Sequence, residues 1–330
     1  MFRLLAKYWA FEEMKRRDFF TFLLAGVAGA LKGDAASAPR THRRESHGAS
    51  VLPAPTQLNR VGVSTSSFRN RFQTAHDESA KTPAGRLALL DFPQLIADRF
   101  KIHNLEFATS HFPSLEPTYL EELKASLVRA HSKLINIRVD VKEIDQAGGL
   151  SDSDLALRST AIAVVRSWID IARQLGAHSV ECDPGCTDPD DLMPTISSYQ
   201  QLASYSRAKG VIVLMENRCD VACAHPEALV KILRAVASPF VGALPDFGEF
   251  PDEVTRLRGL PILFPYAHTL CHAKGLQLNA NGNETAFDFG RCVAISKQAG
   301  YKGIYSVEYE GDDDAYAGVQ GVVNELLRYL

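Results

Sequence analysis

The sequence predicts a single α/β domain built as a (β/α)₈ barrel, and three observations support this fold class. Eight short apolar runs recur between residues 60 and 310 of the 330-residue chain, with helix-like segments between them. No long hairpin signal joins neighbouring runs, so the strands are expected to pair in parallel. Eight strand–helix units over about 270 residues match the size of such a barrel. A doubly wound open sheet, the alternative, usually has fewer strands.

The predicted strands are short apolar runs, several of which end at a charged residue. A dinucleotide-binding fold would have a GxGxxG loop at the end of its first strand. The first predicted strand here runs into GVSTSSF, which lacks that motif. Runs of this kind are typical of strands buried on both faces of a parallel sheet. The eight strands are predicted at residues 60–65, 103–109, 134–141, 177–183, 211–217, 241–247, 266–274 and 303–310.

The clearest predicted helix covers residues 154–175. From Val165 to Leu175 its apolar residues recur at spacings of three and four, which places them on one face. Gly176 is expected to end this helix, and Pro226 suits the first turn of a later one. Comparable patterns predict helices at residues 119–131, 194–208, 226–236 and 287–298.

The N-terminal residues have the pattern of an export signal rather than of a folded domain. The stretch MKRRDFFTFLLAGVAGALKGDAASA contains the pair Arg16 and Arg17, then a short apolar run and small residues. This order predicts a twin-arginine signal peptide over residues 1–38, with Met14 as the true start, and a periplasmic location. An ordinary amphipathic helix or an uncleaved anchor is the alternative. A Pro- and Ser-rich flexible tether is predicted at 39–58, followed by the barrel at 59–330.

Charge and cysteine content limit the classes of function. The formal net charge is −3 and no long basic run follows residue 44, so nucleic acid is not an expected partner. We expect the mature domain to contact no membrane, and oligomerisation stays open. The pairs Cys182/Cys186 and Cys219/Cys223 have a poor spacing for zinc. Free thiols and one or two disulfides are equally compatible with an exported protein.

One ionisable side chain lies at the end of each of the last four predicted strands: Glu216, Asp246, His272 and Glu308. Consecutive strand ends are neighbours at the mouth of a barrel, where function is usually found. Three clustered carboxylates repel one another unless a cation lies between them. We therefore predict that all four bind one divalent metal ion, with Mn²⁺ or Mg²⁺ favoured and Co²⁺ or Zn²⁺ as alternatives.

Each of these residues also has a structural interpretation. Glu216 could cap the turn that follows its strand, Asp246 could hold its own turn, and His272 could be a buried barrel histidine. Two further residues share the strand parity of the predicted ligands. His268 is expected to point inward one layer deeper, and Glu310 lies nearer the loop than Glu308.

From residue 60 to the C-terminus the chain resembles the sugar-phosphate isomerase/epimerase superfamily, the xylose isomerase-like TIM barrels, in its twin-arginine-exported branch. The resemblance implies metal ligands at Glu216, Asp246, His272 and Glu308. The family often has Asn where Glu249 stands and another polar residue near Glu181, departures that are expected to leave the metal site alone. The resemblance rests on RSWIDIARQLGAHSVECDPG, VLMENR, LPDFGEF, AHTLCHAKG, GNETAFDFGR and AGYKGIYSVEYEG.

The ligand set and the resemblance together predict a metal-dependent isomerase or epimerase of carbohydrate metabolism. A keto-sugar or polyol would pass through a metal-bound enediolate, with Glu216 and Glu308 as the acid/base pair. Lys274 is expected to steady the enediolate oxygen. Three residues near strand ends are expected to bind substrate: His111, Asn217 and Arg218.

Three other functions compete with this prediction. A lyase, dehydratase or hydrolase acting on a keto-sugar or glycoside could use the same metal site, and the ligand set does not separate it from an isomerase. An endonuclease IV-like enzyme would need several more histidines at the strand ends. A sugar-binding protein without catalysis would tolerate loss of the four ligands.

Overall fold

The computed structural model describes residues 55–330, except 73–85, 146–147, 186–187, 219–221 and 223. The predicted signal peptide and most of the predicted tether lie outside these residues, as do Cys186, Cys219 and Cys223. The other three cysteines are buried free thiols. None of the described helices is both long and apolar enough to cross a membrane.

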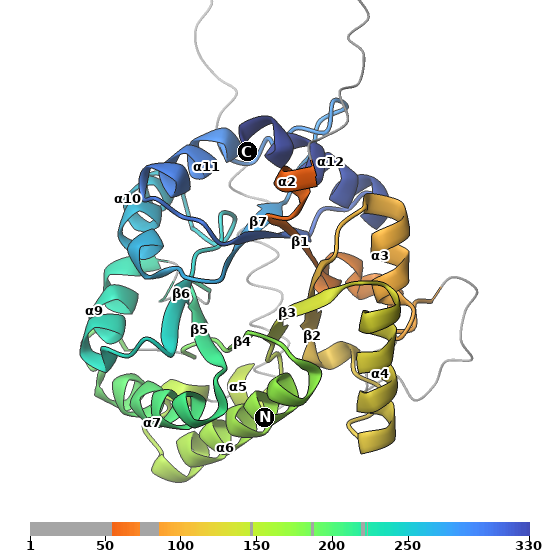
Figure 1. The fold of residues 1–330 in the computed structure, drawn as a ribbon. Coiled ribbons are helices and arrows are strands. Elements are labelled where there is room, and N and C mark those ends of the chain that lie inside the picture. The colour runs from red at the N-terminus through yellow and green to blue at the C-terminus, as the bar shows by residue number, and fades with distance from the viewer. Residues whose placement is uncertain (1–54, 73–85, 146–147, 186–187, 219–221, 223) are drawn as a thin grey trace, which may run out of the picture. The chain divides into compact units, whose positions relative to one another are not determined.

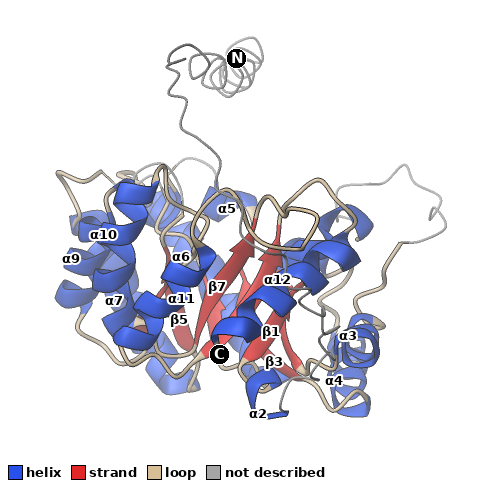
Figure 2. Ribbon diagram, turned by 90° about the horizontal axis from the view of Figure 1, so that it is seen from above, coloured by secondary structure: helices blue, strands red, loops and turns tan. Residues whose placement is uncertain are grey.

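Among the described residues, eight parallel strands form one sheet that curls into a barrel, and a ring of helices surrounds it (Figure 1). Figure 2 shows the same strands from the side, enclosed by the helices. The strand order β6-β5-β4-β3-β2-β1-β8-β7 confirms the predicted (β/α)₈ barrel. The strands are β1 Val61–Ser64, β2 Asn104–Ala108, β3 Lys133–Arg138, β4 Ser179–Glu181, β5 Ile212–Glu216, β6 Val241–Leu244, β7 Leu270–Gly275 and β8 Ile304–Tyr309.

The barrel closes between β6 and β7 through two of the predicted metal ligands. Asp246 and His272 form an isolated parallel bridge just beyond the end of β6. Phe247 N donates to His272 O at 3.2 Å, and His272 N donates to Pro245 O at 3.0 Å. The backbone of the closure therefore fixes these two residues next to each other.

The helices lie between successive strands, as a parallel barrel requires. Short 3₁₀ turns add to them at Thr65–Arg71 (η1), Thr109–His111 (η2), Gly149–Ser151 (η3) and Phe264–Tyr266 (η4). The helices are α2 Pro55–Leu58, α3 Phe92–Phe100, α4 Pro117–Arg129, α5 Lys142–Asp145, α6 Leu155–Leu175, α7 Met193–Lys209, α9 Pro226–Val236, α10 Glu253–Leu263, α11 Phe289–Gln298 and α12 Ala315–Tyr329.

Helix α6 shows how the sequence determines one of these elements. Asp154 caps its start, because its side chain accepts hydrogen bonds from the N–H groups of Ala156 and Leu157. Gly176 ends it in the left-handed conformation, with φ of 80°. The predicted apolar face from Val165 to Leu175 is buried, which confirms this helix and its boundaries.

The structure corrects the sequence predictions in three places. Besides α2, four of the described helices lie outside the predicted helical segments: α3, α5, α10 and α12. Of these, α10 contains Pro261 and α12 contains two glycines, which weaken a helical pattern. The last four residues of the predicted tether form α2, whose Leu58 packs against the core. Strand β7 begins at Leu270 rather than at residue 266, so His268 precedes it and is exposed. Its ring nevertheless lies at the bottom of the barrel interior, because a Cβ atom built on Gly242 would lie 3.3 Å from His268 Cδ2 and 3.4 Å from Leu214 Cδ2.

A bulge in β3 changes which of its side chains enter the barrel. The pairing with β2 shifts by one residue between Leu105 and Glu106. Ile135 consequently joins an apolar cluster inside the barrel, while the adjacent Asn136 donates to Glu181 Oε2 in the layer above. Arg138, two residues further along, then also faces the interior.

The barrel interior is divided into an apolar and a polar layer. Toward the N-terminal ends of the strands, a small cluster of buried aliphatic residues fills it: Ile135, Leu214, Leu244 and Leu270. Toward the C-terminal ends, the interior side chains are ionisable and almost fully buried: Glu106, Arg138, Glu181, Glu216, His272 and Glu308. Ionisable groups buried at this density need partners, and their contacts define the candidate site.

Candidate active site

The structure brings the four predicted metal ligands together at the C-terminal end of the barrel. Glu216 ends β5, Asp246 follows β6, and His272 and Glu308 lie on β7 and β8. Each is at most 1% exposed, and one ligand atom from each lies within 4.8 Å of the others. His272 Nδ1 is 2.7 Å from Glu216 Oε1, 3.3 Å from Asp246 Oδ2 and 3.5 Å from Glu308 Oε2.

Two of the carboxylates use one oxygen for support and turn the other toward this cluster. Asp246 Oδ1 accepts from the backbone N–H groups of Gly248 and Glu249 at 2.6 and 3.2 Å. Glu308 Oε1 accepts from Arg138 Nη1 at 3.0 Å. The turn-holding role considered for Asp246 is therefore real, and it leaves the second oxygen available for a ligand.

The remaining oxygens fit a bound cation. Glu216 Oε2 is buried and makes no hydrogen bond with the described residues, and Asp246 Oδ2 and Glu308 Oε2 likewise lack a hydrogen bond but lie 3.1 and 3.2 Å from the Lys274 ammonium. A buried carboxylate oxygen without a hydrogen bond is costly unless a cation compensates it. Three carboxylate oxygens and one imidazole nitrogen form a donor set that suits Mn²⁺, Mg²⁺ or Zn²⁺. These residues therefore fit one divalent ion.

Lys274 places a fixed positive charge beside this donor set. Its Nζ lies 3.1 Å from Asp246 Oδ2 and 3.2 Å from Glu308 Oε2, and the side chain is 2% exposed. Glu249 and Glu310 contact the same ammonium at 2.6 and 3.3 Å. Burial alone would lower the pKa of Lys274, but these four carboxylates raise it well above its ordinary value. Lys274 therefore stays charged inside the barrel.

A glycine makes room for the Lys274 side chain. A Cβ atom built on Gly248 would lie 2.7 Å from Lys274 Cδ and 2.9 Å from its Cγ. Gly248 lies two residues after Asp246 in the LPDFGEF segment. The loop that carries a predicted ligand therefore also leaves the space that the Lys274 side chain occupies. The carboxylate of the neighbouring Glu249 borders the predicted metal site through its contact with Lys274.

Three further charged residues surround the cluster from the opposite strands. His272 Nε2 lies 3.0 Å from Glu106 Oε1 and 3.8 Å from Glu181 Oε2. Arg138 pairs with Glu308 at 3.0 Å and lies 3.6 Å from Glu181. Glu181 thus also borders the site. Sequence reasoning missed Glu106 and Arg138, because each lies inside a predicted strand, whereas Glu216 was identified by its place at the end of one.

These contacts shift the pKa values of two buried carboxylates, Glu308 and Glu181, in opposite directions. Burial acts to raise the pKa of Glu308, but Lys274, His272 and Arg138 together lower it well below its ordinary value. Burial raises the pKa of Glu181 well above its ordinary value, and repulsion from a neighbouring carboxylate adds to the effect. Glu308 is therefore held ionised, whereas Glu181 favours its neutral form.

Two predicted substrate-binding residues, Asn217 and Arg218, follow Glu216 directly. The Asn217 amide holds the loop after β6, because its Oδ1 accepts from Asp246 N at 2.7 Å and its Nδ2 donates to Glu249 O at 3.1 Å. Arg218 is about one-third exposed, with its Nε 3.8 Å from Asp183 Oδ2. Their contact with substrate stays a prediction, and Asn217 also connects Glu216 to the backbone of Asp246.

His111, the third predicted substrate-binding residue, ends the turn η2 that follows β2. Its ring stacks on Phe72, with the ring centroids 4.3 Å apart. Together with Tyr119 and Pro113, these residues line a largely apolar cavity of about 300 Å³. Burial lowers the pKa of His111 to about 4. His111 therefore lies outside the cluster of metal-ligand candidates, and its role toward substrate stays a prediction.

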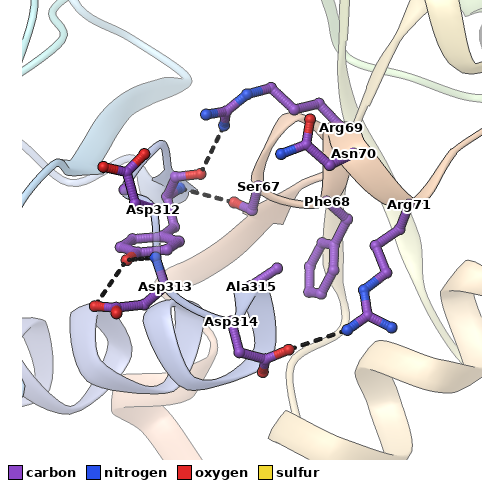
Figure 3. Close-up of a pocket in the computed structure, with 11 residues that line it drawn as sticks. Ser67, Phe68, Arg69, Asn70, Arg71, Asp312, Asp313, Asp314 and Ala315 are labelled. Atoms are coloured by element: carbon purple, nitrogen blue, oxygen red, sulfur yellow. Dashed lines mark hydrogen bonds and ion pairs between the residues drawn. The ribbon is translucent and has the colours of Figure 1, made fainter.

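A second cavity of about 250 Å³ opens where β1 and β8 end (Figure 3). In the figure, Arg69 reaches toward the end of β8, where it donates to Tyr309 O at 3.2 Å. It also donates to Glu310 O at 3.0 Å. Arg71 pairs with Asp314 at 3.0 Å across the same cavity. These bonds connect the first and last strand ends of the barrel beside the Glu308–Glu310 segment. Sequence reasoning did not identify this cavity.

Comparison with known proteins agrees with this architecture. A family model described as xylose isomerase-like TIM barrel matches residues 100–329. A search of curated protein sequences finds no match. Among solved structures, a xylose isomerase-like TIM barrel protein from Mycobacterium smegmatis in complex with magnesium has 15% identity and a TM-score of 0.59. The alignment covers 82% of this chain and 95% of that one.

Two other solved structures show the same fold. The IOLI protein with a bound zinc atom has 13% identity and a TM-score of 0.64, covering 82% of this chain and 99% of that one. The 3-keto-D-glucoside 4-epimerase from E. coli has 15% identity and a TM-score of 0.58, with the same coverage. At this level of identity, the similarity establishes the fold.

Proposed function

Because the chain belongs to the xylose isomerase-like TIM barrel family, we propose that it is a divalent-metal-dependent isomerase or epimerase. Its substrate would be a keto-sugar or a polyol. The observation that carries the proposal is the convergence of Glu216, Asp246, His272 and Glu308 on one buried point. Structural neighbours that are described as epimerases, or that hold magnesium or zinc, support it.

Glu216, Asp246, His272 and Glu308 would hold the metal ion. When bound there, a divalent cation would polarise the substrate carbonyl and make the neighbouring C–H bond more acidic. The donor set of three carboxylates and one imidazole favours Mn²⁺ or Mg²⁺, with Zn²⁺ and Co²⁺ as alternatives.

Glu216 and Glu308 would move the proton. Glu308 is ionised and can therefore accept the proton from the carbon next to the carbonyl, which leaves an enediolate. Glu216 would enter the reaction protonated and would give its proton to the opposite face of the same carbon, which forms an epimer, or to the adjacent carbon, which forms an isomer. In either case the two glutamates exchange protonation states in each turnover.

Lys274 would stabilise the negative charge that develops on the enediolate oxygens. Its ammonium is already held by Asp246, Glu249, Glu308 and Glu310, so it would not need to reorganise during the reaction. The two outer glutamates keep it in place, and exclusion of water strengthens its electrostatic effect.

The proposal includes export of the protein to the periplasm through the twin-arginine pathway. It rests on Arg16, Arg17 and the apolar run after them. Cell fractionation of the full chain tests this. The protein should appear in the periplasm, and replacing both arginines by lysine should retain it in the cytoplasm.

Two measurements test the activity. Metal analysis of the purified mature protein should find about one divalent ion per chain, and a protein without affinity for Mn²⁺ or Zn²⁺ would overturn the site assignment. Incubation with a panel of keto-sugars in D₂O should then show exchange of one C–H proton. Elimination of a β-hydroxyl group would instead identify a lyase. Cleavage of a glycoside would identify a hydrolase.

A further inference from the structure

We infer that Glu106 is the positioning residue that aims His272 at the metal ion. This inference rests on the proposed function, because it assumes that His272 is a metal ligand. Glu106 lies on β2 and its bond to His272 on β7 crosses the barrel interior. Both side chains are fully buried, and no motif in the sequence connects them.

The two nitrogens of His272 face different groups. Nδ1 faces the three carboxylates of the candidate metal site, at 2.7 to 3.5 Å. Nε2 faces the opposite side, where Glu106 Oε1 lies at the hydrogen-bonding distance of 3.0 Å. The ring therefore spans the gap between the metal-ligand cluster and Glu106.

A neutral histidine can offer only one nitrogen lone pair to a cation, and the other nitrogen carries the proton. A carboxylate that accepts from Nε2–H fixes this tautomer, orients the ring and makes Nδ1 a stronger ligand. Glu106 meets these conditions, since it is an acceptor at hydrogen-bonding distance from Nε2. Without it, either nitrogen could carry the proton and the ring could turn.

Glu181 offers a natural comparison within the same pocket. Its Oε2 lies 3.8 Å from His272 Nε2, which is too far for a hydrogen bond. It contacts Arg138 and Asn136 instead. Glu181 therefore lies beside the histidine without fixing its tautomer, which makes it a control for any general effect of changing this pocket.

Zinc binding to three variants of the mature protein tests the inference, with Zn²⁺ added to metal-free protein in a calorimeter. Glu106→Leu removes the acceptor and should weaken Zn²⁺ binding by about 10- to 100-fold. Glu106→Gln removes the charge but keeps an acceptor oxygen, so it should stay within about fivefold of wild type. Glu181→Leu should also stay close to wild type.

The protonated nitrogen of His272 can be read directly from the ¹⁵N NMR spectrum of the zinc-loaded wild-type protein. The inference expects Nε2 to carry the proton, which needs no variant and is independent of whether Glu106→Leu folds. Protonation at Nδ1, equal losses in Glu106→Leu and Glu106→Gln, or unchanged binding in Glu106→Leu would each overturn it. A zinc ion bound to Nε2 within the group Glu106, Glu181 and His272 would do the same.

These results separate the inference from the proposed function. A wild-type protein that binds no Zn²⁺ or Mn²⁺ would overturn the metal site itself, and the role of Glu106 with it. A wild-type protein that binds metal and exchanges a substrate proton, but shows no dependence on Glu106, would overturn the positioning role alone.

Discussion

The ammonium nitrogen of Lys274 lies 3.1 Å from Oδ2 of Asp246, the residue whose backbone bridge with His272 closes the barrel. The buried Asp246 carboxylate thus belongs to the candidate metal site and also forms an ion pair with Lys274. A cation bound by Asp246 would lie near that charge and be repelled by it. Lys274 is therefore expected to weaken metal binding while it assists the chemistry.

Lys274→Met tests these two opposite effects in one variant. The thioether chain fills a similar volume without charge, so Mn²⁺ should bind several-fold more tightly, because a repulsive charge is gone. Substrate proton exchange should fall by about 10²- to 10³-fold, the loss typical of removing one group that stabilises an oxyanion. The exposed Lys302→Met serves as the control for both measurements. Unchanged exchange would remove Lys274 from the proposed mechanism.

Glu308→Gln should abolish most proton transfer and largely preserve metal binding. The amide keeps an oxygen toward the site but cannot accept the substrate proton, so exchange with D₂O should fall by about 10²- to 10⁴-fold. Glu310→Gln is the matched control. That side chain is 31% exposed and contacts Lys274 at the edge of the site, so a loss below about tenfold is expected. Similar losses in both variants would contradict the assignment of Glu308.

Gly248→Ala should slow the reaction without changing any ionisable group. The new methyl group would lie 2.7 Å from Lys274 Cδ and would displace the lysine side chain. Exchange should fall by about tenfold or more, as misplacement of a catalytic group commonly causes. In a Lys274→Ala background the same change should have a smaller effect, since most of the clashing atoms are gone. If the effects of Gly248→Ala and Lys274→Ala on proton exchange were simply additive, Gly248 would not act through the position of Lys274.

Removal of the metal ion should destabilise the folded protein. Without a cation, the buried Glu216 Oε2 has no hydrogen-bond partner among the described residues, and the mass-action term of binding is also lost. At an Mn²⁺ concentration of 100 times its Kd, that term is about 2.7 kcal/mol. The thermal midpoint should therefore drop when EDTA is added and recover with excess Mn²⁺. An unchanged midpoint in the metal-binding protein would contradict this prediction.

His111 should make stability depend on pH in the mildly acidic range. Burial lowers its pKa from 6.5 to about 4. Between these values the unfolded chain binds a proton that the folded protein does not, so stability falls as the pH falls through this range. Below pH 4 the loss is complete, at about 3 kcal/mol.

Urea unfolding at pH 7 and at pH 4.5 measures this effect. The loss of stability between the two pH values should be smaller in His111→Gln than in wild type. His178→Gln, at an exposed position, should leave the wild-type loss unchanged. An equal loss in wild type and His111→Gln would show that other groups cause the pH dependence.

The sequence determined the strand count, the parallel arrangement and four residues that the fold brings together. Each signal was local, because apolar runs define buried parallel strands and Glu216 or Asp246 stands out where such a run ends. Parallel connection alone places consecutive strand ends at one mouth. Residues at the ends of consecutive strands can therefore be predicted to share one site, even though no individual contact between them is known from the sequence.

Only the tertiary structure decided which groups surround that site. The β3 bulge that brings Arg138 inward, and the contact of Glu106 with His272, depend on strand register and on packing across the barrel. The exposure of His268 likewise depends on where β7 begins to pair. Register is set by the sum of many contacts between distant segments, so a one-residue shift leaves no mark in the local sequence.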